Sequence, residues 1–271
     1  MKQIVVCFDL DGTLVDQNGG IHPNDKTLLT AGSPSIMFIG CTGRSLESTR
    51  KTLRKNGLFL EEKIPIPLVL LNGTLVYGKN EEFLDYTSFS QETQGVLIER
   101  AKNQKEITFL FLTQEKTYVL GENQFGRELI KKYEFNPLPF DELRSDTAVS
   151  KVMCISQNAG ILNEFKIENN KDAFEQEFSM PTILEITPFG RNKGEGIRQL
   201  LKEYSLENAQ VRAAGDGGND LSMIPVADVF FAPVSAPSDI KKFAAEVVDV
   251  RNSGLLSEMI KWQDQGKCEN N

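Results

Sequence analysis

Cysteine and histidine are scarce in this chain of 271 residues, which contains four cysteines and one histidine. The cysteines are far apart and form neither a Cys-x-x-Cys pair nor a Cys/His cluster, which argues against a zinc site and a disulfide framework. They are Cys7, Cys41, Cys154 and Cys268. Cys7 and Cys41 lie in apolar stretches, so we expect them to be small, buried hydrophobic residues.

Long apolar runs are also missing. No run is long enough to cross a bilayer. Only a few apolar residues separate Lys2 from Asp9, which is too few for the core of a signal peptide. We therefore expect a cytoplasmic protein with reduced cysteines.

Positive charge is in deficit, because the net charge is −8 and the isoelectric point is near 5.0. Nucleic acids and anionic membranes are bound by clustered lysines and arginines, so neither is an expected partner. A local basic pocket for one small phosphorylated molecule is compatible with this overall charge.

Strand and helix patterns alternate at both ends of the chain, which is typical of an α/β fold. Apolar strands are expected at 4–8, 36–41, 211–214 and 229–231, and helices at 25–31, 45–56, 193–204 and 220–226. Between residues 80 and 187, helical segments alternate with strands of two-residue period, which predicts an antiparallel sheet covered by helices. One of these helices is expected at 161–177. The sequence thus predicts a parallel-sheet core over 1–79 and 188–271, interrupted by an α+β module over 80–187.

The segment Asp-Leu-Asp-Gly-Thr at residues 9–13 directly follows the first apolar strand. The strand brings Asp9 to the carboxyl end of the sheet, and the turn at Asp11 can aim a second carboxylate at the same place. Two like charges so close are unfavourable unless a cation lies between them or one carries a proton. Taken alone, the segment is equally compatible with an ordinary Asp-Gly turn.

Two further segments indicate an anion site. Thr42 and Gly43 follow the second strand and precede a helix, where a hydroxyl group, close backbone approach and the helix N-terminus favour a phosphate. Lys193 lies in the first turn of a helix, where a cation is misplaced unless it neutralises a bound phosphate and nearby carboxylates. A helix N-cap at Thr42 or Ser45 and a solvated lysine are the simpler alternatives.

The fourth segment is Gly-Asp-Gly-Gly-Asn-Asp at residues 215–220, again after an apolar strand. Asp216, Asn219 and Asp220 supply oxygen ligands of the kind that Mg²⁺ prefers, although a capped helix after a glycine turn has the same composition. All four segments lie at the carboxyl ends of strands or at the adjoining helix starts. Open α/β sheets place their ligand sites there.

In this order, the four segments resemble the motifs of the haloacid dehalogenase (HAD) superfamily, particularly its Cof-type subfamily IIB phosphatases. The matching residues are 9–13, Thr-Gly-Arg at 42–44, Asn-Lys-Gly at 192–194 and 215–220. The resemblance covers essentially the whole chain. It implies a Rossmann-like parallel core with an inserted C2-type cap.

The resemblance also implies roles for individual residues. Asp9 would be the nucleophile and Asp11 the general acid and base, while Thr42 and Lys193 would hold the phosphoryl group. Mg²⁺ would be bound by the Asp9 carboxylate, the Asp11 backbone carbonyl and Asp216, with support from Asn219 and Asp220.

Three more residues are candidate substrate contacts. Gly43 lies beside Thr42, and Asn72 follows the third strand at a position where the family has an Asn-Gly pair, although a plain turn explains it equally well. Arg44 could bind substrate, but pairing with an acid is the simpler expectation.

The expected activity is Mg²⁺-dependent hydrolysis of a small phosphorylated metabolite, such as a sugar phosphate, through an aspartyl-phosphate intermediate. The alternatives are a phosphomutase, which returns the phosphoryl group to the substrate, and a non-catalytic sensor of phosphorylated metabolites. The protein is expected to be a monomer or a homodimer.

Overall fold

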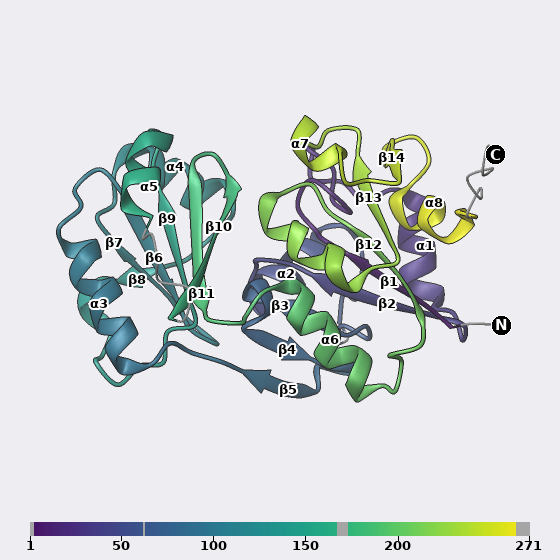
Figure 1. Ribbon diagram of the computed structural model, residues 1–271, viewed down its shortest axis with the longest axis horizontal. Coiled ribbons are helices and arrows are strands. Elements are labelled where there is room, and N and C mark those ends of the chain that lie inside the picture. Colours follow the sequence, from purple (N-terminus) through teal and green to yellow (C-terminus); the bar gives the residue numbers. More distant parts are fainter. Residues whose placement is uncertain (1–2, 62, 167–172, 264–271) are drawn as a thin grey trace, which may run out of the picture.

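The computed structural model describes residues 3–61, 63–166 and 173–263, and it divides into two lobes, each built on its own sheet (Figure 1). The larger sheet has eight strands in the order β14-β13-β12-β1-β2-β3-β4-β5, and the smaller has six in the order β10-β11-β9-β6-β7-β8. We call the lobe with the larger sheet the core and the other lobe the cap. This arrangement confirms the predicted α/β class with an inserted α+β module.

The core sheet is parallel from β14 to β3, and its last two pairings, β3 with β4 and β4 with β5, are antiparallel. Its strands are β1 (Ile4–Phe8), β2 (Ile36–Cys41), β3 (Leu68–Leu70), β4 (Leu75–Tyr77), β5 (Phe83–Tyr86), β12 (Gln210–Ala214), β13 (Val229–Pro233) and β14 (Glu246–Val248). Its helices are α1 (Pro23–Ala31), α2 (Leu46–Lys55), α6 (Lys193–Glu203), α7 (Ser238–Lys241) and α8 (Leu255–Lys261).

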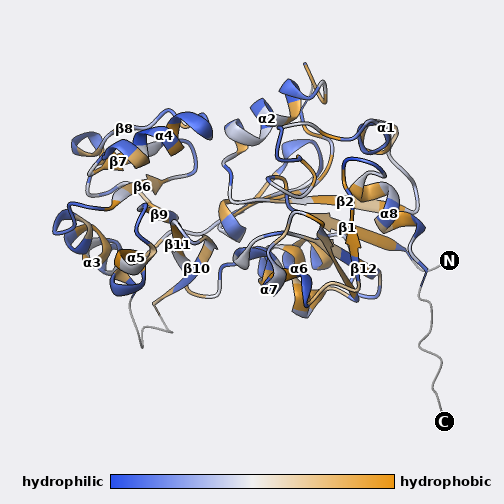
Figure 2. Ribbon diagram, turned by 90° about the horizontal axis from the view of Figure 1, so that it is seen from above, coloured by the Kyte–Doolittle hydropathy of each residue, from blue (hydrophilic) through white to orange (hydrophobic). Residues whose placement is uncertain are grey.

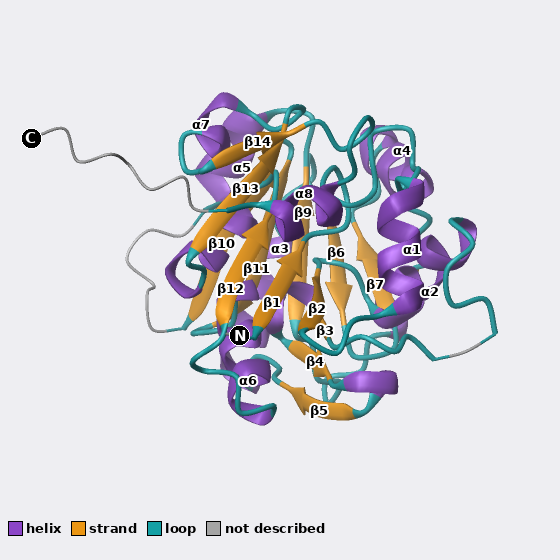
Figure 3. Cartoon of the chain, turned by 90° about the vertical axis from the view of Figure 1, so that its right-hand side faces the viewer, coloured by secondary structure: helices purple, strands orange, loops and turns teal. Residues whose placement is uncertain are grey.

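The core is a three-layer structure because its central strands are apolar on both faces. Val6 and Phe8 of β1 pack with α1, α2 and α8, whereas Val5 and Cys7 pack with α6 and α7. Alternate residues of a strand point to opposite faces, so one short apolar run contributes to both hydrophobic layers. Figure 2 shows the hydrophobic strands between these two groups of helices, and Figure 3 shows β12, β1 and β2 side by side.

The cap sheet is antiparallel except for the short β7–β8 pair. Its strands are β6 (Thr108–Leu112), β7 (Thr117–Leu120), β8 (Leu138–Pro139), β9 (Lys151–Ile155), β10 (Phe174–Met180) and β11 (Ile183–Pro188). Its helices are α3 (Gln91–Lys102), α4 (Gln124–Lys132) and α5 (Ala159–Phe165). Helices α3 and α5 cover one face, where Phe109 and Phe111 are fully buried, and α4 packs on the other face.

Two predicted helices differ from the structure. The helix expected at 161–177 ends at Phe165. Phe174–Met180 is a strand instead, because its backbone pairs with β11 in an antiparallel ladder. Residues 167–172 of that prediction lie outside the described residues. The helix expected at 220–226 is a 3₁₀ helix over Gly218–Val226 that contains Pro225, which cannot donate an α-helical hydrogen bond.

The division into a core of 1–79 and 188–271 and an inserted module of 80–187 stays a prediction. Strand β5 begins after residue 79 and pairs with β4 in the core sheet, so the crossing between the lobes lies after Tyr86 in the structure.

Cys7 and Cys41 are buried and free, in agreement with their expected role as hydrophobic residues, and Cys154 is also buried and free. Cys268 lies outside the described residues. No helix within the described ranges is both long and apolar enough to span a membrane.

The first prediction concerns the attachment of α8 to the core. The buried carboxylate of Asp25 accepts hydrogen bonds from the backbone N–H groups of Leu255 (2.7 Å) and Ser257 (3.1 Å) at the start of α8. Asp25→Ala leaves these donors without a partner and should lower the free energy of unfolding by about 1–3 kcal/mol in urea titrations. Asp239→Ala, in an exposed position of α7, is the control and should stay within about 0.5 kcal/mol of the wild type. Equal unfolding midpoints for the two variants would contradict this role of Asp25.

Candidate active site

The predicted site residues lie together at the carboxyl edge of the core sheet, under the cap. One cavity of about 630 Å³ is lined by eight of them, namely Asp9, Asp11, Thr42, Gly43, Arg44, Asp216, Asn219 and Asp220. Lys193 and Asn72 line a smaller neighbouring cavity together with Asn219. The carboxyl ends of parallel strands meet at one edge of a sheet, which explains how segments far apart in the sequence share this site.

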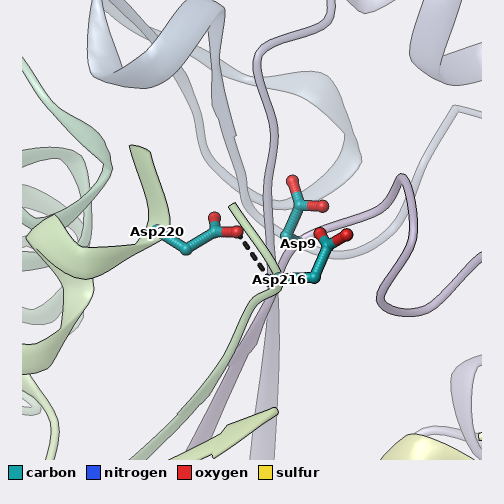
Figure 4. A group of neighbouring side chains, drawn as sticks. All are labelled: Asp9, Asp216 and Asp220. Atoms are coloured by element: carbon teal, nitrogen blue, oxygen red, sulfur yellow. Dashed lines mark hydrogen bonds between the residues drawn. The ribbon is translucent and has the colours of Figure 1, made fainter. Parts of the chain in front are cut away.

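Three carboxylates form the centre of the site (Figure 4). One carboxylate oxygen of each of Asp9, Asp216 and Asp220 lies within 4.8 Å of the corresponding oxygens of the other two. Asp9 is at the end of β1, Asp216 follows β12, and Asp220 is in the 3₁₀ helix that comes next.

Lys193 is the cation that compensates part of this negative charge. Its Nζ atom donates to Oδ1 of Asp9 at 2.6 Å and to Oδ1 of Asp220 at 2.7 Å, and its side chain is almost completely buried. Burial opposes the charge of the ammonium group, but the two carboxylates outweigh this effect and raise the pKa of Lys193. Lys193 is therefore not the solvated lysine that a position in a first helical turn usually indicates.

Among the described residues, no second cation forms an ion pair with Asp9, Asp216 or Asp220. Burial raises the pKa of Asp9 well above its ordinary value; Lys193 lowers it, and the neighbouring acids raise it further. Burial and the charge of Asp220 raise the pKa of Asp216 to about 7. Such shifts arise where carboxylates are held together without enough positive charge, and a bound cation removes them.

The donor set fits a hard divalent cation. Oδ1 of Asp9 is engaged by Lys193 and Oδ1 of Asp216 accepts from the hydroxyl of Thr13 at 3.1 Å. Both carboxylates line the cavity and could hold a metal. Gly12 makes this possible, because a Cβ atom there would lie 2.2 Å from Oδ2 of Asp216.

Asp220 supports the site and does not offer a free oxygen. Its Oδ2 atom accepts from the backbone N–H groups of Asp216 and Gly217, both at 2.9 Å, and its Oδ1 atom is held by Lys193. Asp220 thus closes the glycine turn and fixes Asp216. Asn219 donates to Oδ1 of Asn72 at 3.2 Å, so both amide side chains point into the site.

Asp11 forms a bidentate ion pair with Arg44. Nε and Nη2 of Arg44 donate to the two carboxylate oxygens, each at 2.6 Å, and Nη1 donates to Ser48 at 2.7 Å. Although burial lowers the pKa of Arg44, the hydrogen bonds and charge of Asp11 outweigh it and raise that pKa. In this conformation both oxygens of Asp11 are occupied by Arg44.

Thr42 and Gly43 form the turn between β2 and α2. Ser45 is the N-cap of α2, since its side chain accepts from the N–H of Ser48, which leaves Thr42 free of that task. The Thr42 hydroxyl is buried and accepts from the N–H of Arg44 at 3.2 Å. Thr42 is thus placed beside Asp9 at the neighbouring strand end, as a phosphate-binding hydroxyl requires.

Several cavity residues from the cap were not predicted from the sequence. Tyr133 at the end of α4, Met153 in β9, and Met180 and Glu185 in β10 and β11 line the cavity opposite the carboxylates. Nζ of Lys151 forms an ion pair with Oε1 of Glu185 at 2.7 Å. The available signal was a single charged residue in each of two otherwise apolar strands, β9 and β11.

Comparisons with known proteins show the family of the chain. A family model of haloacid dehalogenase-like hydrolases matches residues 6–260. In Bacillus subtilis, 5-amino-6-(5-phospho-D-ribitylamino)uracil phosphatase YwtE is 25% identical over 265 residues, which is 88% of this chain and 90% of that protein. The crystal structure of TM0651 from Thermotoga maritima matches with a TM-score of 0.78 and 25% identity, over 97% of this chain and 98% of that one. A HAD subclass IIB sugar phosphatase has the same fold, with a TM-score of 0.72 and 21% identity over 90% of this chain and 92% of that one.

The chain belongs to the haloacid dehalogenase-like hydrolase family. It is an enzyme of the Cof-type group of this superfamily, which confirms the resemblance that its motifs indicate.

The second prediction tests the cation site without any substrate. Mg²⁺ at about 100 times its dissociation constant should stabilise the wild-type protein by about 2.7 kcal/mol. Asp216→Asn removes one ligand and should lose most of this gain. In EDTA the same variant should unfold at a higher temperature than the wild type, because one uncompensated carboxylate is gone. Thermal unfolding with Mg²⁺ and with EDTA measures both effects, and equal stabilisation of the two proteins by Mg²⁺ would rule out Asp216 as a ligand.

Proposed function

We propose that this protein is a Mg²⁺-dependent phosphomonoesterase that hydrolyses a small phosphorylated metabolite through an aspartyl-phosphate intermediate. The observation that carries the proposal is the buried contact of Lys193 with Asp9, which lines one cavity together with Asp216 and Thr42. A carboxylate with one oxygen fixed and one oxygen free is suited to attack a phosphorus atom. Membership of the family and the phosphatase activity in the name of the B. subtilis relative support the same reaction class.

Asp9 is the nucleophile in this proposal. Lys193 holds its Oδ1, which leaves Oδ2 to form the new oxygen–phosphorus bond while the bond to the leaving oxygen breaks in line. The ammonium group also reduces the repulsion between the Asp9 carboxylate and the phosphate dianion. Mg²⁺, held by Asp9 and Asp216, would supply further charge neutralisation at the phosphoryl oxygens.

Thr42 and Gly43 hold the phosphoryl group from the side of α2. The Thr42 hydroxyl can donate to a phosphoryl oxygen while it accepts from the N–H of Arg44. Gly43 has no side chain, so the backbone can approach the anion closely.

Asp11 completes the reaction as general acid and then general base. It first donates a proton to the leaving alkoxide, and then takes a proton from the water that attacks the aspartyl phosphate. The second step releases inorganic phosphate and restores Asp9. Because Arg44 occupies both oxygens of Asp11 in the structure, the proposal requires Asp11 to leave Arg44 during turnover.

The cavity limits the substrate to a small molecule. Its volume of about 630 Å³ lies in the range of small-molecule sites, and the cap closes it with Tyr133, Phe135, Met153 and Met180. These side chains offer apolar contacts to the part of the substrate that remains after phosphate release.

The third prediction is the direct test of this function. The wild-type protein with Mg²⁺ should release inorganic phosphate from p-nitrophenyl phosphate and from some members of a panel of sugar, nucleotide and cofactor phosphates. Asp9→Asn removes the nucleophile and should lower kcat by at least about 1000-fold without changing the circular dichroism spectrum. Asp239→Asn, on the exposed surface of α7, is the matched control and should keep full activity.

The products separate the competing functions. Transfer of the phosphoryl group to another hydroxyl of the substrate, without phosphate release, would identify a phosphomutase. Binding of phosphorylated metabolites without any turnover would identify a sensor. Undiminished turnover by Asp9→Asn would refute the assignment of the nucleophile.

A further inference from the structure

A buried ion pair of the cap reaches the core beside the catalytic residues. Lys151 in β9 and Glu185 in β11 are the only buried charged side chains in the described strands of the cap sheet, with 0% and 5% of their surface exposed. Their Nζ and Oε1 atoms are 2.7 Å apart. The function proposed above uses neither residue.

The strand register explains why both residues face the core. Glu185 pairs with Met153, which lies two residues after Lys151 and therefore on the same face of the sheet. The alternate residues Val152 and Leu184 are in the apolar cluster under α3 and α5. The cap thus directs its apolar face to its own helices and one charged pair toward the site.

The pair contacts three separate loops of the core. Lys151 donates to the backbone carbonyl of Gly43 at 3.0 Å. Oε2 of Glu185 accepts from Nδ2 of Asn72 at 2.6 Å and from Nδ2 of Asn219 at 3.3 Å. A Cβ atom at residue 43 would lie 2.9 Å from the Lys151 ammonium group, so a side chain there would make the end of Lys151 shift.

These loops carry residues of the proposed reaction. The N–H of Asn72 donates to the carbonyl of Thr42 at 3.2 Å. The loop that carries Asn72 and the Thr42–Gly43 turn are therefore joined to each other within the core. The cap pair connects both of them to Asn219, which follows Asp216 in the metal-binding turn.

The stability of the fold does not explain the pair. Two charges removed from water lose much hydration, and well-packed apolar residues of similar volume are often equally stabilising or better. Burial lowers the pKa of Lys151 in spite of the opposing charge of Glu185, which shows how strongly the site disfavours this charge. Among the described residues, every side-chain hydrogen bond of the pair, apart from the ion pair itself, goes to a core loop of the active site.

We infer that Lys151 and Glu185 are positioning residues, supplied by the cap to fix the Thr42–Gly43 turn, Asn72 and Asn219. The site is then complete only when the cap is docked on the core. The test of this inference by kcat rests on the proposed function. The test by hydrogen exchange rests on the loop contacts alone.

The fourth prediction uses Lys151→Met, Glu185→Leu and the double variant. Each single variant leaves one buried charge without its partner and should unfold at a lower temperature than the wild type. The double variant removes both charges and should regain much of that stability. Its kcat for p-nitrophenyl phosphate should nevertheless stay about 10- to 100-fold below the wild-type value, with a smaller change in KM, because the loops have lost their support.

A second measurement is independent of turnover. Hydrogen exchange of the backbone amides in residues 42–44 and 71–73, followed by mass spectrometry, should be faster in the double variant than in the wild type. The matched control is Asp85→Asn, which breaks a half-exposed ion pair to Arg191 (2.9 Å) whose two residues do not line the large cavity. This variant should keep wild-type kcat and wild-type exchange in both loops.

The outcomes distinguish the two proposals. A double variant with wild-type kcat, or with unchanged exchange in both loops, would overturn the positioning role and leave a purely structural ion pair. Absence of turnover in the wild-type protein would instead defeat the proposed function, and the exchange measurement would still decide the role of Lys151 and Glu185.

Discussion

Lys193 is a buried ammonium group between the carboxylates of Asp9 and Asp220, and the site depends on this contact. Asp9 follows β1, Asp220 lies in the 3₁₀ helix after β12, and the two would repel each other without a cation between them. Lys193 reaches them from the first turn of α6, where a helix N-terminus normally disfavours positive charge. Lys193 therefore occupies an unfavourable helix position, and from there its charge stabilises two buried acids. Asp216 adds a further carboxylate, and the proposed divalent cation would neutralise the resulting excess of negative charge.

The core site could be predicted from the sequence because its geometry follows from topology. Asp9, Thr42 and Asp216 each follow an apolar strand, and the carboxyl ends of parallel strands meet at one edge of the sheet. A prediction of parallel strands is therefore sufficient to predict that these side chains lie close together. The same reasoning does not give their hydrogen bonds. The pairing of both Asp11 oxygens with Arg44, and the role of Asp220 in closing the turn before it, became visible only in three dimensions.

The contribution of the cap could not be predicted from local pattern. Lys151 and Glu185 are single charges in apolar strands, and their meaning depends on the register of β9 against β11 and on how the cap sits on the core. Neither is encoded by short-range periodicity. The helix expected at 161–177 was wrong beyond Phe165 for a related reason, since the pairing of Phe174–Met180 with β11 makes this segment a strand.

Diffraction from crystals containing Mn²⁺ in place of Mg²⁺ tests the central claim most directly, because the anomalous signal locates the ion without reference to activity. One strong peak is expected within about 2.0–2.3 Å of a carboxylate oxygen of Asp9 and of Asp216, with Asp220 still held by Lys193 and the backbone. An ion bound by Asp220 in place of Lys193, or a peak outside this group of carboxylates, would contradict it.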